Sequence, residues 1–165
     1  MPADLLGATP VLLCLGLLAG AAASDLASYT IPNRLVLAML ALYPAQLAQG
    51  PGAASWGDPL AALAVLAAGF LLFSRGRIGA GDVKLASVVV LWAGVKGAAA
   101  FLVVTALAGG VLALAVAGPC RFILARAALA AGVGRLHDGL VARELPYGVA
   151  IAAGGLAALA PRLAG

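Results

Sequence analysis

The chain has 165 residues, of which 64% are hydrophobic and only 10% are charged, and its mean hydropathy is +1.12. Soluble domains carry about 45–50% apolar and about 25% charged residues, so this composition excludes an ordinary soluble domain and is typical of an integral membrane protein. The net charge of +4 is not gathered into a basic cluster interleaved with aromatic residues, so we expect no nucleic-acid partner.

Six apolar stretches approach the length of about 20 residues that a membrane-spanning helix needs. In chain order they cover about residues 5–23, 35–47, 60–73, 83–93, 98–117 and 145–160, and the second could extend to Gln49 and the fourth to Val95. Helix-interrupting residues separate them, among them Pro32, Asn33, Gly50, Pro51, Gly52, Pro59, Gly76, Gly79, Gly81, Gly118 and Pro119. We therefore expect an all-α integral membrane protein, a polytopic bundle of about six transmembrane helices forming a single domain over residues 1–165. Five spans are the alternative, if the second or fourth stretch is re-entrant.

The distribution of basic residues orients this predicted bundle, because Lys and Arg collect on the cytoplasmic side of membrane proteins. With six spans and both termini outside, the outside segments hold only Lys96 and Arg162. The other eight basic residues lie inside: Arg34, Arg75, Arg77, Lys84, Arg121, Arg126, Arg135 and Arg143. Residues 120–143 are predicted to form an interfacial helix followed by a loop on the inner surface, in contact with the lipid bilayer.

The same topology brings two aspartates to one depth. Asp25 lies at the inner end of the first stretch and Asp82 at the inner end of the fourth, whereas Asp4 and Asp58 fall on the outer surface, where we expect solvated loop residues. A carboxylate costs about 2.5–3.5 kcal/mol at the centre of a membrane and less near its surface, so such a group normally has a function or a partner. Two carboxyl groups that meet share one proton, which is the state that aspartic proteases use to activate water.

Spacing alone leaves other interpretations of these aspartates open. Asp25 could be a helix N-cap or a loop residue, and Asp82 could pair with the nearby Lys84. A proton or ion pathway is a further alternative, because transporters also place acids inside their bundles. A metal site is not expected, since two carboxylates without a nearby His or Cys suit zinc poorly and Cys14 and Cys120 lie far apart with no CxxC spacing. No cofactor is expected either.

Three motifs, in this order, resemble those of the type IV prepilin peptidases. DLASYTIPNRL at residues 25–35 is similar to their aspartate followed by IPN, GAGDVKL at 79–85 to their GxGD motif with its lysine, and LPYGVAIAAG at 145–154 to the PYG motif of their last helix. The resemblance implies a membrane-embedded GxGD-type aspartic endopeptidase with Asp25 and Asp82 as its catalytic pair. It also implies its substrates, prepilins and pilin-like precursors, whose short basic leader is removed at the cytoplasmic face of the bacterial inner membrane.

The resemblance extends to residues with expected supporting or substrate-side roles: Pro32, Asn33, Gly79, Gly81, Lys84 and Tyr147. Simpler interpretations stand beside these roles, because Pro32 can end a helix, Lys84 can extend to the membrane surface and Tyr147 can be an interfacial tyrosine.

Longer members of the family carry an extra cytoplasmic domain with paired CxxC motifs and also methylate the new N-terminus. No CxxC occurs here, so the chain resembles the short, peptidase-only form of tight-adherence (Flp) pilus systems, and no N-methyltransferase activity is expected. The alternative function is that of a small proton-coupled membrane transporter or a pilus assembly factor.

Overall fold

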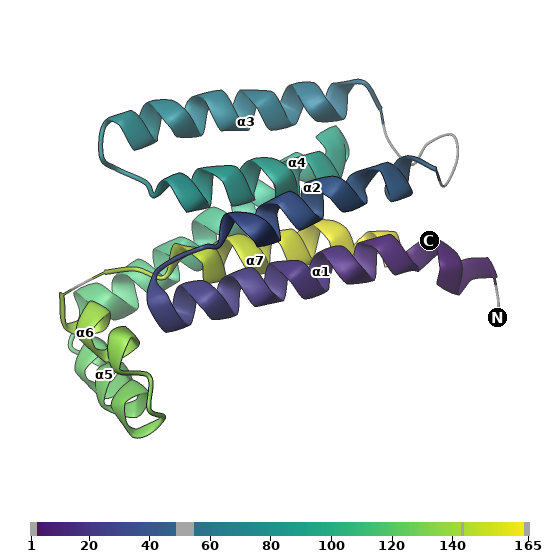
Figure 1. The fold of residues 1–165 in the computed structure, drawn as a ribbon. Helices are drawn as coiled ribbons and strands as arrows, with labels where there is room; N and C mark the ends of the chain where they lie inside the picture. Colours follow the sequence, from purple (N-terminus) through teal and green to yellow (C-terminus); the bar gives the residue numbers. More distant parts are fainter. Residues whose placement is uncertain (1–2, 49–54, 143, 164–165) are drawn as a thin grey trace.

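The computed structural model describes residues 3–48, 55–142 and 144–163, and these residues are helical except for short connections. The helices are α1 (Ala3–Ser28), α2 (Asn33–Leu47), α3 (Gly57–Ser74), α4 (Ala80–Ala117), α5 (Cys120–Ala130), α6 (Gly134–Ala142) and α7 (Tyr147–Leu159), followed by the 3-10 helix η1 (Ala160–Leu163). Helices α1, α2, α3, α4 and α7 lie alongside one another, whereas α5 and α6 stand at the end of the bundle where α1 ends and α7 begins (Figure 1). We call this end the inner end and the opposite end the outer end. Gln49, Gly50, Pro51, Gly52 and Arg143 lie outside the described residues.

The longest helix, α4, contains a sharp bend at Gly94. This residue has φ 69° and ψ 175°, a backbone conformation that glycine adopts without steric cost. Val83 before the bend and Thr105 after it line the same pocket, so the chain folds back at Gly94 and the two halves of α4 lie close together. The stretches expected at residues 83–93 and 98–117 are therefore two helical segments that meet at the kink at Gly94, and both lie within α4.

Three helical segments are long and apolar enough to cross a membrane: Ala8–Ser28 in α1, Gly57–Ser74 and Ala80–Ala117. Helices α6 and α7, related by a bend of 100°, give a fourth candidate if the pair counts as one span. Helix α2 has only 15 residues and is not among these candidates. The all-helical architecture is thus confirmed, whereas the expected count of six spans is not.

The hydrophobic core lies between α1, α2, α4 and α7. Small residues of α7 let its neighbours approach closely, since a side chain at Gly154 would collide with Thr105 of α4 and one at Gly155 with Leu18 of α1. Trp92 of α4 is fully buried, and its Nε1 donates a hydrogen bond of 3.0 Å to the carbonyl oxygen of Met39 in α2. The packing of small against large residues therefore fixes α1, α2 and α7 around α4.

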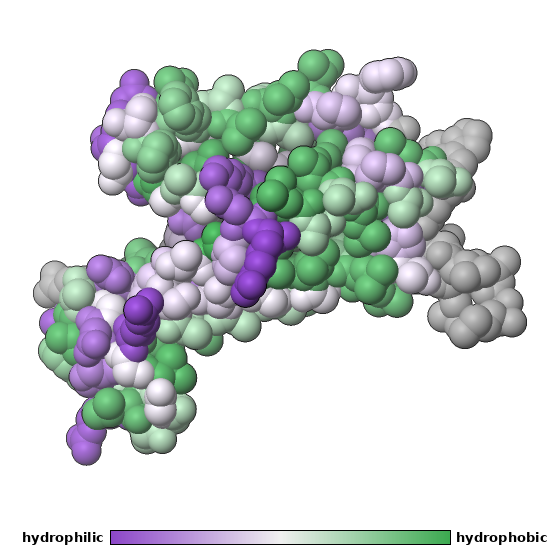
Figure 2. Space-filling model, in the orientation of Figure 1, coloured by the Kyte–Doolittle hydropathy of each residue, from purple (hydrophilic) through white to green (hydrophobic). Residues whose placement is uncertain are grey.

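Two elements lie outside this core. In α3 only Asp58 is buried, and its leucines and phenylalanines are exposed, as suits a helix that faces lipid. At the inner end, α5 and α6 form a separate small apolar cluster with Val116, Ala125 and Leu140. The loop expected after one helix in residues 120–143 was wrong, because residues 134–142 form a second helix whose Leu140 packs in this cluster. Figure 2 shows hydrophobic residues over much of the bundle and mixed hydrophilic and hydrophobic residues over α5 and α6.

Candidate active site

Asp25 lies in the last turn of α1 and is buried, with 6% of its surface exposed. Its Oδ2 accepts a hydrogen bond of 2.7 Å from the backbone N–H of Gly148, in the first turn of α7. The N–H groups of a first helical turn have no partner within the helix and suit a carboxylate. A Cβ atom at Gly148 would lie 2.9 Å from Asp25 Oδ2, so this close approach requires glycine. The structure therefore excludes the interpretation of Asp25 as an N-cap or loop residue.

Asp82 lies in the first turn of α4 and is half-buried. Its carboxyl group accepts a hydrogen bond from the backbone N–H of Gly79, the N-cap residue of the same helix. An acidic side chain that reaches back to the N-cap N–H is one half of a capping box and holds the carboxyl group near the helix start. Each aspartate is thus oriented by the backbone of one glycine.

The packing of the inner end brings the two aspartates together. Ile31, in the connection after α1, is buried and would lie 3.2 Å from a Cβ atom at Gly81. The chain after Asp25 therefore packs directly against the glycine before Asp82. The two carboxyl groups lie within range of a direct electrostatic interaction.

The expected supporting residues divide into two groups. Pro32 is the N-cap residue of α2, and Lys84 Nζ donates a hydrogen bond of 3.2 Å to Asn33 Oδ1, which joins the starts of α2 and α4. Lys84 and Asn33 are exposed, and within the described part of the chain Lys84 is held by Asn33 rather than paired with Asp82. Gly79 donates its backbone N–H to the Asp82 carboxyl group, and Gly81 packs against Ile31.

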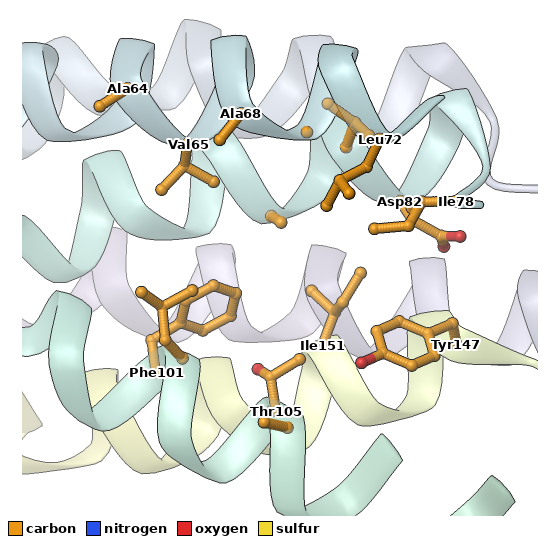
Figure 3. Close-up of a pocket in the computed structure, with 15 residues that line it drawn as sticks. Ala64, Val65, Ala68, Leu72, Ile78, Asp82, Phe101, Thr105, Tyr147 and Ile151 are labelled. Carbon is orange, nitrogen blue, oxygen red and sulfur yellow. The ribbon is translucent and has the colours of Figure 1, made fainter. Parts of the chain in front are cut away.

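Tyr147 comes close to the site without joining the pair. It lines a pocket together with Asp82, but its ring and hydroxyl lie against Gly109 of α4, where a Cβ atom would be 2.7 Å from the hydroxyl oxygen. In Figure 3 the Tyr147 hydroxyl and the Asp82 carboxyl group point in different directions. The structure thus gives this tyrosine a packing role at the start of α7.

Sequence reasoning missed Tyr29. Its φ of 50° is uncommon for a residue other than glycine, its N–H donates a 2.7 Å hydrogen bond to the carbonyl oxygen of Asp25, and its ring packs against Gly139 of α6. Burial, with smaller contributions from Glu144 and Asp25, raises the pKa of the Tyr29 phenol to about 12. Tyr29 therefore ends α1 just after Asp25 and connects the site to α6. A tyrosine between Asp25 and the IPN sequence gave no signal of this conformation.

The expectation for Asp58 was wrong. This residue is 5% exposed, in the first turn of α3 at the outer end, rather than solvated in a loop. Its carboxyl oxygens accept hydrogen bonds from Ser55 N (2.7 Å), Ser55 Oγ (3.0 Å) and Val95 N (2.9 Å). Asp58 stands in a short polar segment and is followed by proline. This local sequence does not indicate the bend at Gly94, which brings the N–H of Val95 to the Asp58 carboxyl group.

The arrangement at the inner end supports proton transfer. A carboxyl group has about four lone-pair sites when it is ionised, and each of the two aspartates has one backbone N–H as its identified partner. Within the described residues no other hydrogen bond to these carboxyl groups is found, so their remaining lone pairs could accept a proton or a water hydrogen. Two such groups at one end of the bundle are candidates for a general acid and a general base.

The comparisons with known proteins identify the family of this chain. The sequence model described as the type IV leader peptidase family matches residues 12–114, a range that includes Asp25 and Asp82 and ends before Tyr147. None of the curated proteins and none of the solved structures matches the chain.

Proposed function

Since the chain belongs to the type IV leader peptidase family and is therefore a peptidase, we propose that it is an aspartic endopeptidase in which Asp25 and Asp82 form the catalytic pair. The observation that carries the proposal is that two aspartates from distant parts of the chain lie within electrostatic range at one end of an apolar bundle. Each is oriented by a glycine N–H, and among the described residues this N–H is the one hydrogen-bond donor identified for it.

The proposed reaction is the hydrolysis of a peptide bond by water. The ionised carboxyl group of the pair takes a proton from water while the water oxygen bonds to the scissile carbonyl carbon, and the protonated carboxyl group donates its proton to the carbonyl oxygen. The C–N bond then breaks as the tetrahedral intermediate collapses, and the proton taken from water passes to the leaving nitrogen. The intermediate's hydroxyl returns its proton to the other carboxyl group, and the pair is restored with one shared proton.

The proposed substrates are Flp-type prepilins and pilin-like precursors, which lose their short basic leader at the cytoplasmic face of the inner membrane. The distribution of charge supports this orientation, since Lys84, Arg75 and Arg77 lie near the ends of helices at the same end of the bundle as Asp82. The proposal does not include methylation of the new N-terminus. A transporter or an assembly factor remains the alternative only if the chain proves unable to cleave.

The test is leader cleavage in membranes that contain the chain and a pilin precursor from the same genome. Asp25→Asn and Asp82→Asn should each lower the cleavage rate at least about a thousandfold, because each removes one partner of the acid–base pair. Asp58→Asn is the matched control, since it changes an equally buried aspartate at the outer end and should leave cleavage per folded molecule unchanged. The amount of each variant inserted in the membrane is measured alongside.

Two outcomes would contradict the proposal. Normal cleavage by Asp25→Asn or by Asp82→Asn would exclude the catalytic pair. No cleavage of any pilin precursor by the unaltered chain, with a phenotype in pilus assembly or proton uptake, would favour the alternative function.

A further inference from the structure

A groove runs from Asp82 into the apolar part of the bundle. It has a volume of about 460 Å³, which lies within the range of about 300–1,000 Å³ typical of ligand sites. One wall belongs to α3 and the other to the second half of α4 and to α7, and Val83 and Ala86 of the first half of α4 also line the groove. Figure 3 shows Ala64, Val65, Ala68 and Leu72 on one side, Phe101, Thr105, Ile151 and Tyr147 on the other, and Asp82 at one end. A peptide bond at Asp82 would therefore have one flank of its chain at the mouth of this groove.

The groove opens toward the surroundings of the bundle. Leu72 of α3 and Leu102 of α4 line it and are 36% and 49% exposed. Both lie in segments long and apolar enough to span a membrane, and in such a span the opening would face hydrocarbon. The hollow exists because small residues, Ala64 and Ala68 on α3 and Ala106 on α4, stand where larger side chains would fill it.

The groove also contains one polar group that the fold leaves unsatisfied. Thr105 lines it, is 8% exposed, and its Oγ1 has no hydrogen-bond partner within the described residues. A buried hydroxyl without a partner is uncommon and costs free energy, because water cannot replace the missing bond. An unwound peptide carries backbone N–H and C=O groups that have the same need. The Thr105 hydroxyl now lies against Gly154. A change of its rotamer toward the groove would let the hydroxyl and a peptide backbone group form a hydrogen bond with each other.

We propose that this groove binds an apolar, membrane-inserted segment of the substrate on one side of the scissile bond, with the Thr105 hydroxyl bonded to its unwound backbone. The inference rests on the proposed function of Asp82. Because the groove is continuous with Asp82, its occupant is expected to be a peptide. The apolar lining favours a peptide with apolar side chains. The opening toward hydrocarbon provides a route by which the peptide enters from the bilayer. Specificity then requires a continuous apolar flank next to the bond that is cut.

The experiment compares two neighbouring alanines of α3. Ala68 lines the groove, whereas Ala67 is exposed and does not line it. Ala68→Phe should lower the rate of cleavage of a pilin precursor at least about tenfold, because the ring fills space that the substrate needs. Ala67→Phe should leave the rate unchanged. Equal rates for the two variants and the unaltered chain would overturn the proposal.

Cross-linking keeps the test independent of folding and of catalysis. A photoreactive benzoylphenylalanine is placed at position 68 or 67 in the Asp82→Asn background, where the precursor remains uncut. A cross-link to the precursor from position 68 and not from 67 is expected. A cross-link to lipid alone, or equal cross-links from both positions, would overturn the proposal, because the groove would then be an acyl-chain site or no site. Absence of cleavage by the unaltered chain, with position 68 still cross-linked, would instead refute the proposed function.

Thr105→Val tests the hydroxyl at nearly constant shape. It should raise KM for the precursor about three- to tenfold and leave kcat within about twofold, because the lost hydrogen bond is made in both the ground state and the transition state. Thr105→Ser should restore KM. An unchanged KM in Thr105→Val would remove the hydroxyl from the proposed site.

Discussion

The two ends of the bundle each hold buried carboxyl groups, and they differ in how those groups are satisfied. At the outer end, Asp58 is 5% exposed, and three hydrogen bonds from Ser55 and Val95 reach it. At the inner end, Asp25 is 6% exposed and accepts one backbone hydrogen bond, from the N–H of Gly148. Asp58 and Asp25 are therefore buried to the same extent, and they differ in the number of hydrogen-bond donors that reach their carboxyl groups.

This difference indicates what each end can do. Asp58 joins the start of α3 to the bend of α4, since Ser55 precedes α3 and Val95 follows Gly94. A carboxylate with three donors has little capacity left for water or substrate, so it holds structure. Asp25 and Asp82 each have fewer identified donors among the described residues, and they lie within electrostatic range of each other. They are therefore better suited than Asp58 to exchange a proton with water or substrate.

After substitution of Asp25 or Asp82 themselves, the largest loss of cleavage is expected from Gly148→Ala. The added Cβ atom would lie 2.9 Å from both Cβ and Oδ2 of Asp25 and would displace the carboxyl group. A displacement of about 1 Å can cost about a hundredfold in rate, so cleavage should fall about ten- to a hundredfold. Gly110→Ala is the control, because no atom lies within 4 Å of its added Cβ. Equal rates for these two variants would show that the approach of α7 does not orient Asp25.

The next effect concerns pH. At low pH both members of the pair are protonated and no base remains, and at high pH both are ionised and no proton donor remains. The rate of cleavage should therefore follow a bell-shaped curve that falls about tenfold per pH unit on each side, with two apparent pKa values that belong to the pair. Asp58→Asn should leave the curve unchanged. A flat profile across the acidic and neutral range, measured where chemistry limits the rate, would contradict a shared proton.

A smaller effect is expected at the outer end, on stability. Asp58→Asn replaces one acceptor oxygen by an NH₂ group, which faces the N–H and hydroxyl donors of Ser55 and Val95. The free energy of unfolding should fall by about 1–3 kcal/mol, because buried donors lose their acceptor. Thermal unfolding in detergent measures this loss, while cleavage per folded molecule stays constant. A loss of cleavage in fully folded Asp58→Asn protein would mean that the two ends are coupled.

The smallest effect is expected from Tyr29→Phe. The pKa of Tyr29 is raised to about 12, so the phenol is neutral at every pH below this value and cannot produce an alkaline limb near pH 10. The pH profile of Tyr29→Phe should therefore have both limbs in the same place as in the unaltered chain. Its hydroxyl has no hydrogen-bond partner within the described residues, so little else is lost. A shift of the alkaline limb would instead identify Tyr29 as a titrating group of the site.

Much of the inner end was predictable, because its signals are local. The IPN sequence begins a helix with Pro32 as its N-cap, and Asp82 stands in the first turn of α4 after Gly79, as the motif predicts. Topology alone also placed Asp25 and Asp82 at one end. The outer end was not predictable in this way, because the partners of Asp58 include Val95, which is distant in sequence.

By itself, the sequence determined the helical class, the membrane character and the motifs that the family model also matches, because apolar composition and short motifs act within single helices. Tertiary structure decided which carboxyl groups are satisfied. The fold at Gly94 brings Val95 to Asp58, the start of α7 presents a single N–H to Asp25, and the separation of α3 from α7 leaves a groove beside Asp82. These are contacts between helices, and they depend on how closely the glycines and alanines of one helix allow another to approach.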